Sequence, residues 1–220
     1  MAELSAGEGA GSVAGLCAVC SSLAGVNGAG IMLMSGDMPR GSLGTSDEVS
    51  QLIEELQYTL GEGPCVDAYQ QSRVVPEPDL ADPVTRWLAF TPPVLRAGVR
   101  AVFGFPLLLG TVRLGALDLY RDRSGPLSGE QHADALVLAG IAARWVLEVQ
   151  AGASPGTVAG ELEASADFHP VVHNAAGMVS VQLGISVTDA LIRLRAYAFA
   201  RDRLLSEVAQ DVVDRKLRLE

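Results

Sequence analysis

The sequence has few basic side chains. It contains 16 lysine and arginine residues against 26 aspartate and glutamate residues, and only Lys216 is a lysine, so the net charge is −10. Because attraction to phosphate normally requires a positively charged face, this balance argues against broad, non-specific nucleic-acid binding. The acidity belongs to the front of the chain: residues 1–164 hold 19 acidic and 9 basic side chains, whereas residues 165–220 hold seven of each. The C-terminal part is therefore neutral.

The chain also lacks long apolar runs. The longest uncharged ones, such as residues 101–112, contain glycine and proline. They fall short of the roughly 18 apolar residues that a membrane span needs. The N-terminal segment carries two acidic residues and no lysine or arginine, unlike the start of a signal peptide. We therefore expect a cytoplasmic protein with no membrane partner.

Residue types that bind metals or catalyse reactions are scarce as well. Three cysteines are too few, and odd in number, for a secreted disulfide framework. Cys17 and Cys20 form a CxxC pair, but a zinc site needs about four ligands and no second pair exists. There is no phosphate-binding glycine loop, no Ser/His/Asp set with motif context, and no pair of carboxylates at a recognisable spacing. We therefore expect no metal, no cofactor and no enzymatic activity.

A change in composition divides the chain. Of its 220 residues, 49% are hydrophobic, enough for the core of one large domain or two modest ones. Residues 150–160 are small and uncharged, which is typical of a linker. Beyond them, no glycine follows Gly184, no proline follows Pro170, and the apolar residues keep a helical period. We expect a front domain at residues 1–150, a linker at 151–164 and a helical domain at 165–220.

The front domain alternates helical and strand patterns, an order typical of an α+β fold with an antiparallel sheet. Helix patterns fall at residues 13–23, 47–60 and 128–149, and strand patterns at residues 30–34, 40–45, 99–109 and 112–120. Ser128 and Gln131 form a capping box that begins the last helix, and Gly110 with Thr111 forms the turn between the last two strands. The helix at 47–60 has an apolar stripe that we expect to face the core, formed by Val49, Leu52, Ile53, Leu56 and Leu60.

The back domain is predicted to be all α. Its first helix covers about residues 170–183 and ends at Gly184, the second begins after a Ser186 cap, and the third covers about residues 203–217. Helices this short with narrow apolar stripes need mutual packing or a partner chain. We therefore expect a homodimer.

Three motifs in the front domain carry a family resemblance. They are LGEGPCVDAYQQSRVVPEPDL at residues 60–80, RWLAF at 86–90 and VRAVFGFPLLLGTVRLGALDLY at 99–120. In order and spacing they resemble a bacterial GAF sensor domain, which implies an antiparallel sheet flanked by helices and a possible small-molecule pocket. Candidate pocket residues combine aromatic side chains with two that could fix a polar ligand: Arg86, Trp87, Phe90, Phe103, Phe105, Asp118 and Tyr120. Ordinary core packing is the alternative for the aromatic residues.

A second resemblance covers the back domain. The segment AAGMVSVQLGISVTDALIRLRAYAFARDRLLSEVAQDVVDRKL at residues 175–217 contains, in order, Ala176, Gly177, Leu183, Gly184, Ala190, Leu194, Arg195, Ala198, Leu205 and Ala209. It resembles an ANTAR domain, the helical RNA-binding module of transcription antitermination regulators. Where that family usually has a basic residue early in the first helix, this chain has His169 and Pro170. Because proline is tolerated in a first turn, we expect the helix to begin near Asp167 or to kink at Pro170.

Polar side chains of the back domain are the candidates for RNA contact. They are His173, Asn174, Arg193, Arg195, Arg201 and Arg203. Folded RNA is read mainly at unpaired loop bases, through arginine stacking and hydrogen bonds to base edges, which a neutral domain can provide. We expect His173, Asn174 and Arg195 to contact bases, and the other arginines to contact phosphates. From the residues alone, the alternative is a solvated helix face whose arginines pair with Asp189 and Asp202.

The two resemblances together imply a signal-responsive transcription antitermination regulator. Its GAF half would sense a small molecule or partner, and its ANTAR half would bind hairpins in nascent RNA. One alternative is a GAF-fold thiol enzyme, such as a free methionine sulfoxide reductase, that uses Cys65 or the CxxC pair. Cys65 follows Gly63 and Pro64 at a possible helix start, where the helix dipole would lower its pKa, although we favour a structural role for it. In the other alternative the tail serves only for dimerisation.

Overall fold

The computed structural model describes residues 13–35, 38–82, 86–151, 170–201 and 203–219. The chain divides into two compact units, residues 1–168 and residues 169–220. Most of the predicted linker lies outside the described residues, and so do Asp167, His169 and Asp202. The domain limits predicted at residues 150 and 165 therefore stay predictions.

Among the described residues of the first unit, five strands form one antiparallel sheet with the order β2-β1-β5-β4-β3. The strands are β1 (Gly28–Ser35), β2 (Met38–Thr45), β3 (Val75–Glu77), β4 (Ala101–Leu109) and β5 (Val112–Arg121). All neighbouring strands pair antiparallel, so the predicted α+β fold with an antiparallel sheet is confirmed. The four predicted strands are present, and the short β3 was not predicted.

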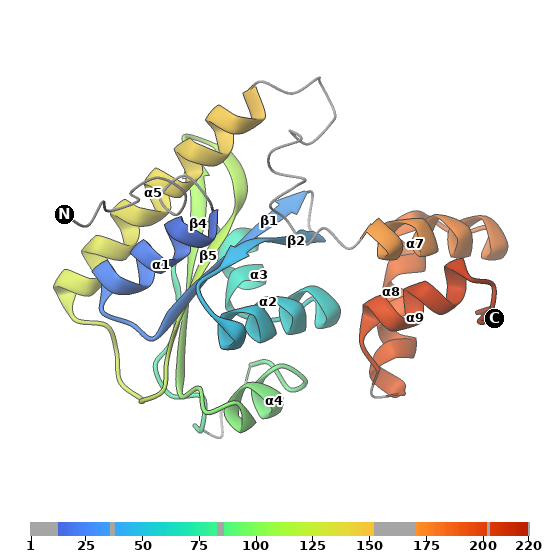
Figure 1. Ribbon diagram of the computed structural model, residues 1–220, viewed down its shortest axis with the longest axis horizontal. Helices are drawn as coiled ribbons and strands as arrows, with labels where there is room; N and C mark the ends of the chain where they lie inside the picture. The colour runs from blue at the N-terminus through green and yellow to red at the C-terminus, as the bar shows by residue number, and fades with distance from the viewer. Residues whose placement is uncertain (1–12, 36–37, 83–85, 152–169, 202, 220) are drawn as a thin grey trace, which may run out of the picture. The chain divides into compact units, whose positions relative to one another are not determined.

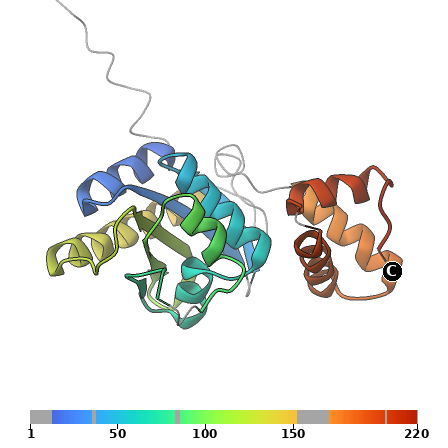
Figure 2. The same cartoon turned by 90° about the horizontal axis from the view of Figure 1, so that it is seen from below.

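Helices cover both faces of this sheet (Figure 1). α1 (Val13–Ala24) and α5 (Gly129–Ala151) pack on one face, and α2 (Glu48–Leu60) and α3 (Pro64–Gln71) pack on the other. The short α4 (Thr91–Arg96) lies on the side of α2 and α3, and Figure 2 shows the same layers from below. The sheet therefore separates two different interiors.

Successive side chains of β5 point alternately into these two interiors. Leu117 and Leu119 join an apolar core with residues of α1 and α5, including Cys17, Cys20 and Ala142. Because successive strand residues point to opposite faces, Asp118 and Tyr120 point toward α2. Replacing a buried leucine such as Leu119 by alanine would cost about 2–5 kcal/mol. One face of the sheet is thus mainly apolar, with the buried Arg121 at the end of β5 as an exception, and the other carries the buried carboxyl and amide groups.

Local sequence signals explain where the longer helices begin and end. α2 begins after Asp47, whose side chain accepts hydrogen bonds from the backbone N–H groups of Val49 and Ser50, and ends at Gly61 with φ 68°. At the start of α5, the Gln131 N–H donates to Ser128 Oγ and the Ser128 N–H donates to Gln131 Oε1, both at 3.1 Å. The predicted capping box is therefore confirmed. The short α3 and α4 were not predicted.

The apolar stripe predicted for α2 is mostly wrong. Of its five residues only Ile53 is buried, and the other four are half-buried. The helix instead buries Ser50, Glu54, Gln57 and Tyr58. A helix that turns its polar side toward the interior departs from the usual pattern, and such departures gather at functional or strained sites.

The described residues of the second unit form α7 (Pro170–Leu183), α8 (Val187–Ala200) and α9 (Leu205–Val213), which pack against one another. Their buried residues are small and apolar, for example Ala176, Leu194 and Val208. Pro170 is the first residue of α7, and Gly184 follows its end with φ 65°. The described part of α7 therefore begins at the proline, in the first turn that tolerates it.

The third helix of the tail is shorter than predicted. α9 ends at Val213, not near Leu217, because Arg215 adopts a left-handed conformation with φ 59°. The backbone N–H groups of Lys216 and Leu217 turn back to the carbonyl of Asp211, at 2.8 and 3.0 Å. The residues after α9 therefore form a separate segment that packs beside the helices.

A helix that crosses a membrane must be both long and apolar. Among the described residues, no single helix is long and apolar enough to cross a membrane. α7 and α8 together reach that length and composition, but they are bent by 107°.

Candidate functional site

Four polar residues meet inside the first unit, between α2 and the sheet. We call Glu54 and Gln57 from α2, Cys65 from α3 and Asp118 from β5 the buried polar cluster. Glu54 is 1% exposed and Asp118 4%, whereas Gln57 and Cys65 are fully buried. Polar side chains seldom occupy such positions unless they are hydrogen-bonded or ionically paired.

Gln57 holds the cluster together. Its side-chain N–H donates to the Asp118 carboxylate, and its Oε1 accepts the backbone N–H of Cys65 at 2.8 Å. One amide therefore links α2, β5 and the first turn of α3. Because Pro64 has no N–H and Cys65 follows it, Gln57 satisfies one of the unpaired donors at the start of α3.

Two glycines leave room for these side chains. A Cβ at Gly30 on β1 would lie 2.6 Å from Glu54 Oε1, and a Cβ at Gly63 would lie 2.5 Å from Gln57 Oε1. Such separations are far below van der Waals contact. The backbone of β1 and the turn before α3 are therefore shaped around Glu54 and Gln57.

The environment of the cluster favours neutral forms. Burial raises the pKa of Asp118 to about 6, and burial together with the adjacent Asp118 raises the pKa of Glu54 well above its ordinary value. Burial and the two carboxyls also raise the pKa of the Cys65 thiol. Cys65 does lie in the first turn of α3, but desolvation outweighs the helix dipole there. The lowered pKa of the alternative interpretation is therefore not found, and a structural role stays the favoured one.

The seven residues predicted to line a ligand pocket do not meet at one site. Asp118 and Tyr120 face α2, whereas Phe103 and Phe105 lie in the apolar core on the opposite face of the sheet. The Phe105 ring packs 5.5 Å from the ring of His132 on α5. The two phenylalanines are therefore ordinary core residues, since the sheet separates them from the polar side.

The remaining pocket candidates lie between α3 and α4. The Trp87 and Phe90 rings meet edge to face at 5.8 Å, and Trp87 Nε1 donates to Asp67 Oδ2 at 3.2 Å. Arg86 is exposed, lies 4.8 Å above the Trp87 ring and pairs with Glu77 at 3.1 Å. These contacts anchor the loop before α4.

All three thiols are buried and unpaired with one another. Cys17 Sγ donates to the carbonyl of Gly44 at 3.2 Å. Burial raises the pKa of the Cys20 thiol to about 11 and raises that of Cys17 further. The CxxC residues therefore behave as small core side chains.

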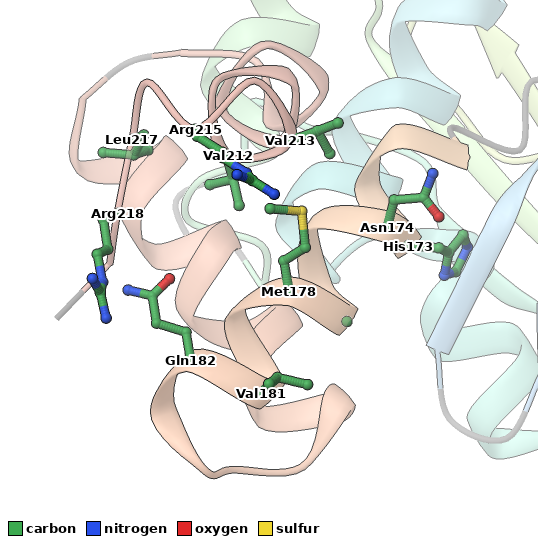
Figure 3. A pocket seen from close by; sticks show the side chains of 11 residues that line it. His173, Asn174, Met178, Val181, Gln182, Val212, Val213, Arg215, Leu217 and Arg218 are labelled. Atoms are coloured by element: carbon green, nitrogen blue, oxygen red, sulfur yellow. The ribbon is translucent and has the colours of Figure 1, made fainter.

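A groove runs along the second unit between α7 and the segment after α9. It has a volume of about 1020 Å³. His173, Asn174, Gly177 and Met178 line it from α7, and further lining comes from the C-terminal side: Val212, Val213, Arg215, Leu217 and Arg218. Figure 3 shows Met178 in its middle, with His173 and Asn174 at one end and Arg218 and Gln182 at the other. The groove is thus apolar inside and polar at its ends.

A second, smaller cavity of about 470 Å³ adjoins the other side of the same C-terminal segment. Arg193, Tyr197 and Arg201 line it from α8 and its end, and Leu217 and Arg218 border both cavities. The Arg201 guanidinium lies 4.2 Å above the Tyr197 ring. Arg218 therefore stands between two concave surfaces that hold four of the six predicted RNA contacts.

The other two predicted RNA contacts are placed differently. Arg195 is half-buried and lines neither of these two cavities. Arg203 is paired with Asp211 at 2.9 Å and with Glu207 at 3.6 Å. Arg215 and Arg218 were not predicted, although they flank Lys216 in the one basic run of a neutral domain, a signal that could have identified them.

Comparisons with known proteins bear on the fold of the first unit. No protein-family model matches the sequence, and no curated protein matches it. Among solved structures, the GAF domain of a phosphoenolpyruvate-protein phosphotransferase from Coxiella burnetii is 13% identical, with a TM-score of 0.51 over 67% of this chain and 87% of that one. This likeness shows a GAF-domain fold.

Two further solved structures are similar at lower scores. A type II free methionine-R-sulfoxide reductase from Thermoplasma acidophilum is 20% identical, with a TM-score of 0.46 over 60% of this chain and 90% of that one. The second GAF domain of DevS from Mycobacterium smegmatis is 15% identical, with a TM-score of 0.44 over 60% and 89%. Neither likeness assigns an activity to this chain.

Proposed function

We propose that the chain is a signal-responsive, cytoplasmic RNA-binding regulator of transcription antitermination. Its GAF-fold unit would sense a small molecule or partner, and its helical unit would bind hairpins in nascent RNA. The proposal combines the fold of the first unit with the resemblance of residues 175–217 to an ANTAR domain. A sensor of this kind acts by favouring one arrangement of the chain, for instance a dimer that presents two RNA sites.

One observation carries the RNA-binding proposal: two adjoining cavities of the helical unit share Arg218 and collect exposed polar side chains from α7 and α8. His173 and Asn174 offer hydrogen bonds to base edges at the end of an apolar groove. Apolar and aromatic surfaces accept unstacked bases, and guanidinium planes stack on them. The surface therefore suits the unpaired loop of a hairpin.

The contacts that each arginine already makes indicate how strongly it can contribute to RNA binding. The Arg201 guanidinium carbon lies 4.2 Å from the centre of the Tyr197 ring, and this pair offers a surface on which a base can stack. Arg203 is already paired with two carboxylates, so it has less positive charge to offer a phosphate. We propose Arg201 and Arg218 as the strongest contacts, and Arg195 and Arg203 as weaker ones.

The test is binding to RNA hairpins selected from a random-loop pool with the parent protein. Arg201→Ala and Arg218→Ala should each weaken binding roughly tenfold or more, because a stacked or bidentate arginine is worth about 1–3 kcal/mol. Arg201→Lys should lose most of this affinity too, since an ammonium group cannot stack in the same way. Arg144→Ala removes an exposed arginine from α5 and is the charge-matched control. Unchanged affinity in the folded variants would leave dimerisation as the role of the tail.

We also propose that the chain is not a thiol enzyme. A catalytic thiol must be accessible and partly ionised. Cys17, Cys20 and Cys65 are fully buried, and burial raises the pKa of each thiol. Turnover of free methionine sulfoxide by the purified chain with a dithiol reductant would contradict this proposal.

A further inference from the structure

Three residues of the buried polar cluster carry atoms that bind metal ions. One ligand atom from each of Glu54, Cys65 and Asp118 lies within 4.8 Å of the other two. Ligands around a tetrahedral zinc ion, with bonds of roughly 2.0–2.3 Å, lie roughly 3–4 Å apart. Small side-chain movements would therefore bring the three atoms onto one ion.

The carboxyls of Glu54 and Asp118 lie within hydrogen-bond reach of each other, and Asp118 also lies within reach of the Cys65 thiol. Both oxygens of Glu54 and Oδ1 of Asp118 are buried and receive no hydrogen bond from an N–H or hydroxyl group of any described residue. Burying such oxygens is costly unless a proton or a cation lies between them. Since the two carboxyls are adjacent, a single cation would satisfy all three oxygens.

The residues around the three ligand atoms orient them and leave them space, as the residues around metal ligands do. Gln57 fixes Asp118 through one carboxylate oxygen and leaves the other open, which is the kind of outer hydrogen bond that orients metal ligands. The same amide holds the backbone N–H of Cys65. Gly30 leaves space for the Glu54 carboxyl, since a Cβ there would lie 2.6 Å from its Oε1.

We propose that Glu54, Cys65 and Asp118 bind one zinc ion. A thiolate beside two carboxylates suits zinc rather than magnesium or calcium, which prefer oxygen ligands alone. On binding, the thiol and the protonated carboxyl release their protons to solvent, and the metal takes their place. The ion would join α2, α3 and β5 and stabilise the GAF-fold unit by mass action. This inference does not rest on RNA binding, and either proposal can fail alone.

The experiment uses the full chain, freed of metal with a chelator and equilibrated with zinc or cobalt. Zinc should bind at one ion per chain and raise the melting temperature. Cobalt should give a thiolate-to-metal charge-transfer band in the near ultraviolet. Cys65→Ser should abolish this band, whereas the Cys17→Ser and Cys20→Ser variants, which alter the other buried thiols, should keep it.

A second pair of variants tests the carboxylate without touching a thiol. Glu54→Gln keeps the shape of the side chain and should weaken zinc binding at least tenfold, whereas Glu55→Gln, on a half-buried neighbour in α2, should not. Circular dichroism checks that each variant is folded. If the parent takes up no zinc at saturation, if the cobalt band survives in Cys65→Ser, or if folded Glu54→Gln binds zinc like the parent, the proposal is wrong. The carboxyl oxygens of Glu54 and Asp118 would then be satisfied by a shared proton and not by a metal ion.

Discussion

Tyr120 on β5 donates a hydrogen bond to Oδ1 of Asp47, the N-cap residue of α2, at 3.0 Å. The same oxygen accepts the backbone N–H groups of Val49 and Ser50, each at 2.9 Å. The beginning of α2 is therefore tied to the centre of the sheet. This link positions Glu54 and Gln57, about two and three turns further along the helix, against Asp118.

The first prediction concerns the charge of Asp47. Partial burial raises its pKa, but hydrogen bonds from Ser46, Ser50 and Tyr120 outweigh burial, so the pKa lies below its ordinary value of 3.8. Its ionised form therefore stabilises the fold above that value, and the contribution is lost as the pH falls through the folded-state pKa. Asp47→Asn keeps a capping oxygen and should lower the free energy of unfolding by about 1 kcal/mol at pH 7.

The measurement is urea unfolding at a series of pH values, followed by tryptophan fluorescence, because Trp87 and Trp145 both lie in the first unit. The difference between parent and Asp47→Asn should shrink and then disappear as the pH falls below 3.8 and through the lowered folded-state pKa of Asp47. Glu48→Gln, on an exposed side chain in the first turn of the same helix, should cost only about 0.3 kcal/mol. A pH-independent difference for Asp47→Asn would contradict the prediction.

The second prediction compares two glycines of the first unit. A Cβ at Gly104 on β4 would lie 2.3 Å from the carbonyl oxygen of Pro64, so Gly104→Ala must push α3 away from the sheet. We expect a loss of about 2–3 kcal/mol. Gly140 lies inside α5 with nothing within 4 Å of its Cβ position, and Gly140→Ala should instead gain about 0.5–1 kcal/mol. If both variants raise the melting temperature, or both lower it, the close approach of Gly104 to Pro64 does not determine the effect of the substitution.

Elements with local signals could be predicted from the sequence. The cap at Asp47 and the capping box of Ser128 with Gln131 use residues three or fewer positions apart, so each signal is visible without the fold. The hairpin turn at Gly110 is of the same kind. By contrast, α3 starts where the Gln57 side chain accepts the N–H of Cys65, and a contact made by the folded chain does not show in a short window.

The candidate sites could be predicted only in part. Periodicity placed the apolar side of α2 inward, but Gln57 is held by Asp118, 61 positions away in the sequence. The ligand set of Glu54, Cys65 and Asp118 has no local spacing and so resembles no metal motif. In the second unit, the groove depends on the left-handed Arg215, which turns the chain back beside α7. Helical periodicity cannot indicate such a turn.

The third prediction concerns the homodimer. α5 exposes large apolar side chains to solvent, including Val137 at 62% and Ile141 at 49%. Neighbouring apolar side chains of this size on one helix indicate an interaction surface, and a second copy of this chain is the occupant that we expect. We expect the parent to be a dimer in light scattering and Ile141→Glu to give a particle of 23.0 kDa. Val112→Glu, at an equally exposed valine on β5, is the matched control and should stay dimeric. If both variants stay dimeric, α5 is not the interface.

The last prediction separates the stability of the helical unit from its proposed binding to RNA. Gly177 lies inside α7, lines the groove, and has nothing within 4 Å of its Cβ position. Because glycine is a poor helix former, Gly177→Ala should stabilise the unit by about 0.5–1 kcal/mol. The added methyl group enters the groove, however, and Gly177→Leu would fill much more of it. RNA affinity should therefore fall from the parent to Gly177→Ala and further to Gly177→Leu, while the helix becomes more stable.

Hydrogen exchange of α7 peptides measures the stability, and titration with the selected hairpins measures the affinity. A variant that merely damages the fold would lose protection and affinity together, whereas occlusion of the groove lowers affinity while protection rises. Gly140→Ala should gain stability in the first unit without any change in RNA affinity, since it lies on α5. If Gly177→Leu is well protected and binds hairpins as tightly as the parent, RNA does not use the groove. The smaller cavity beside Arg193 and Arg201 would then be the surface to test.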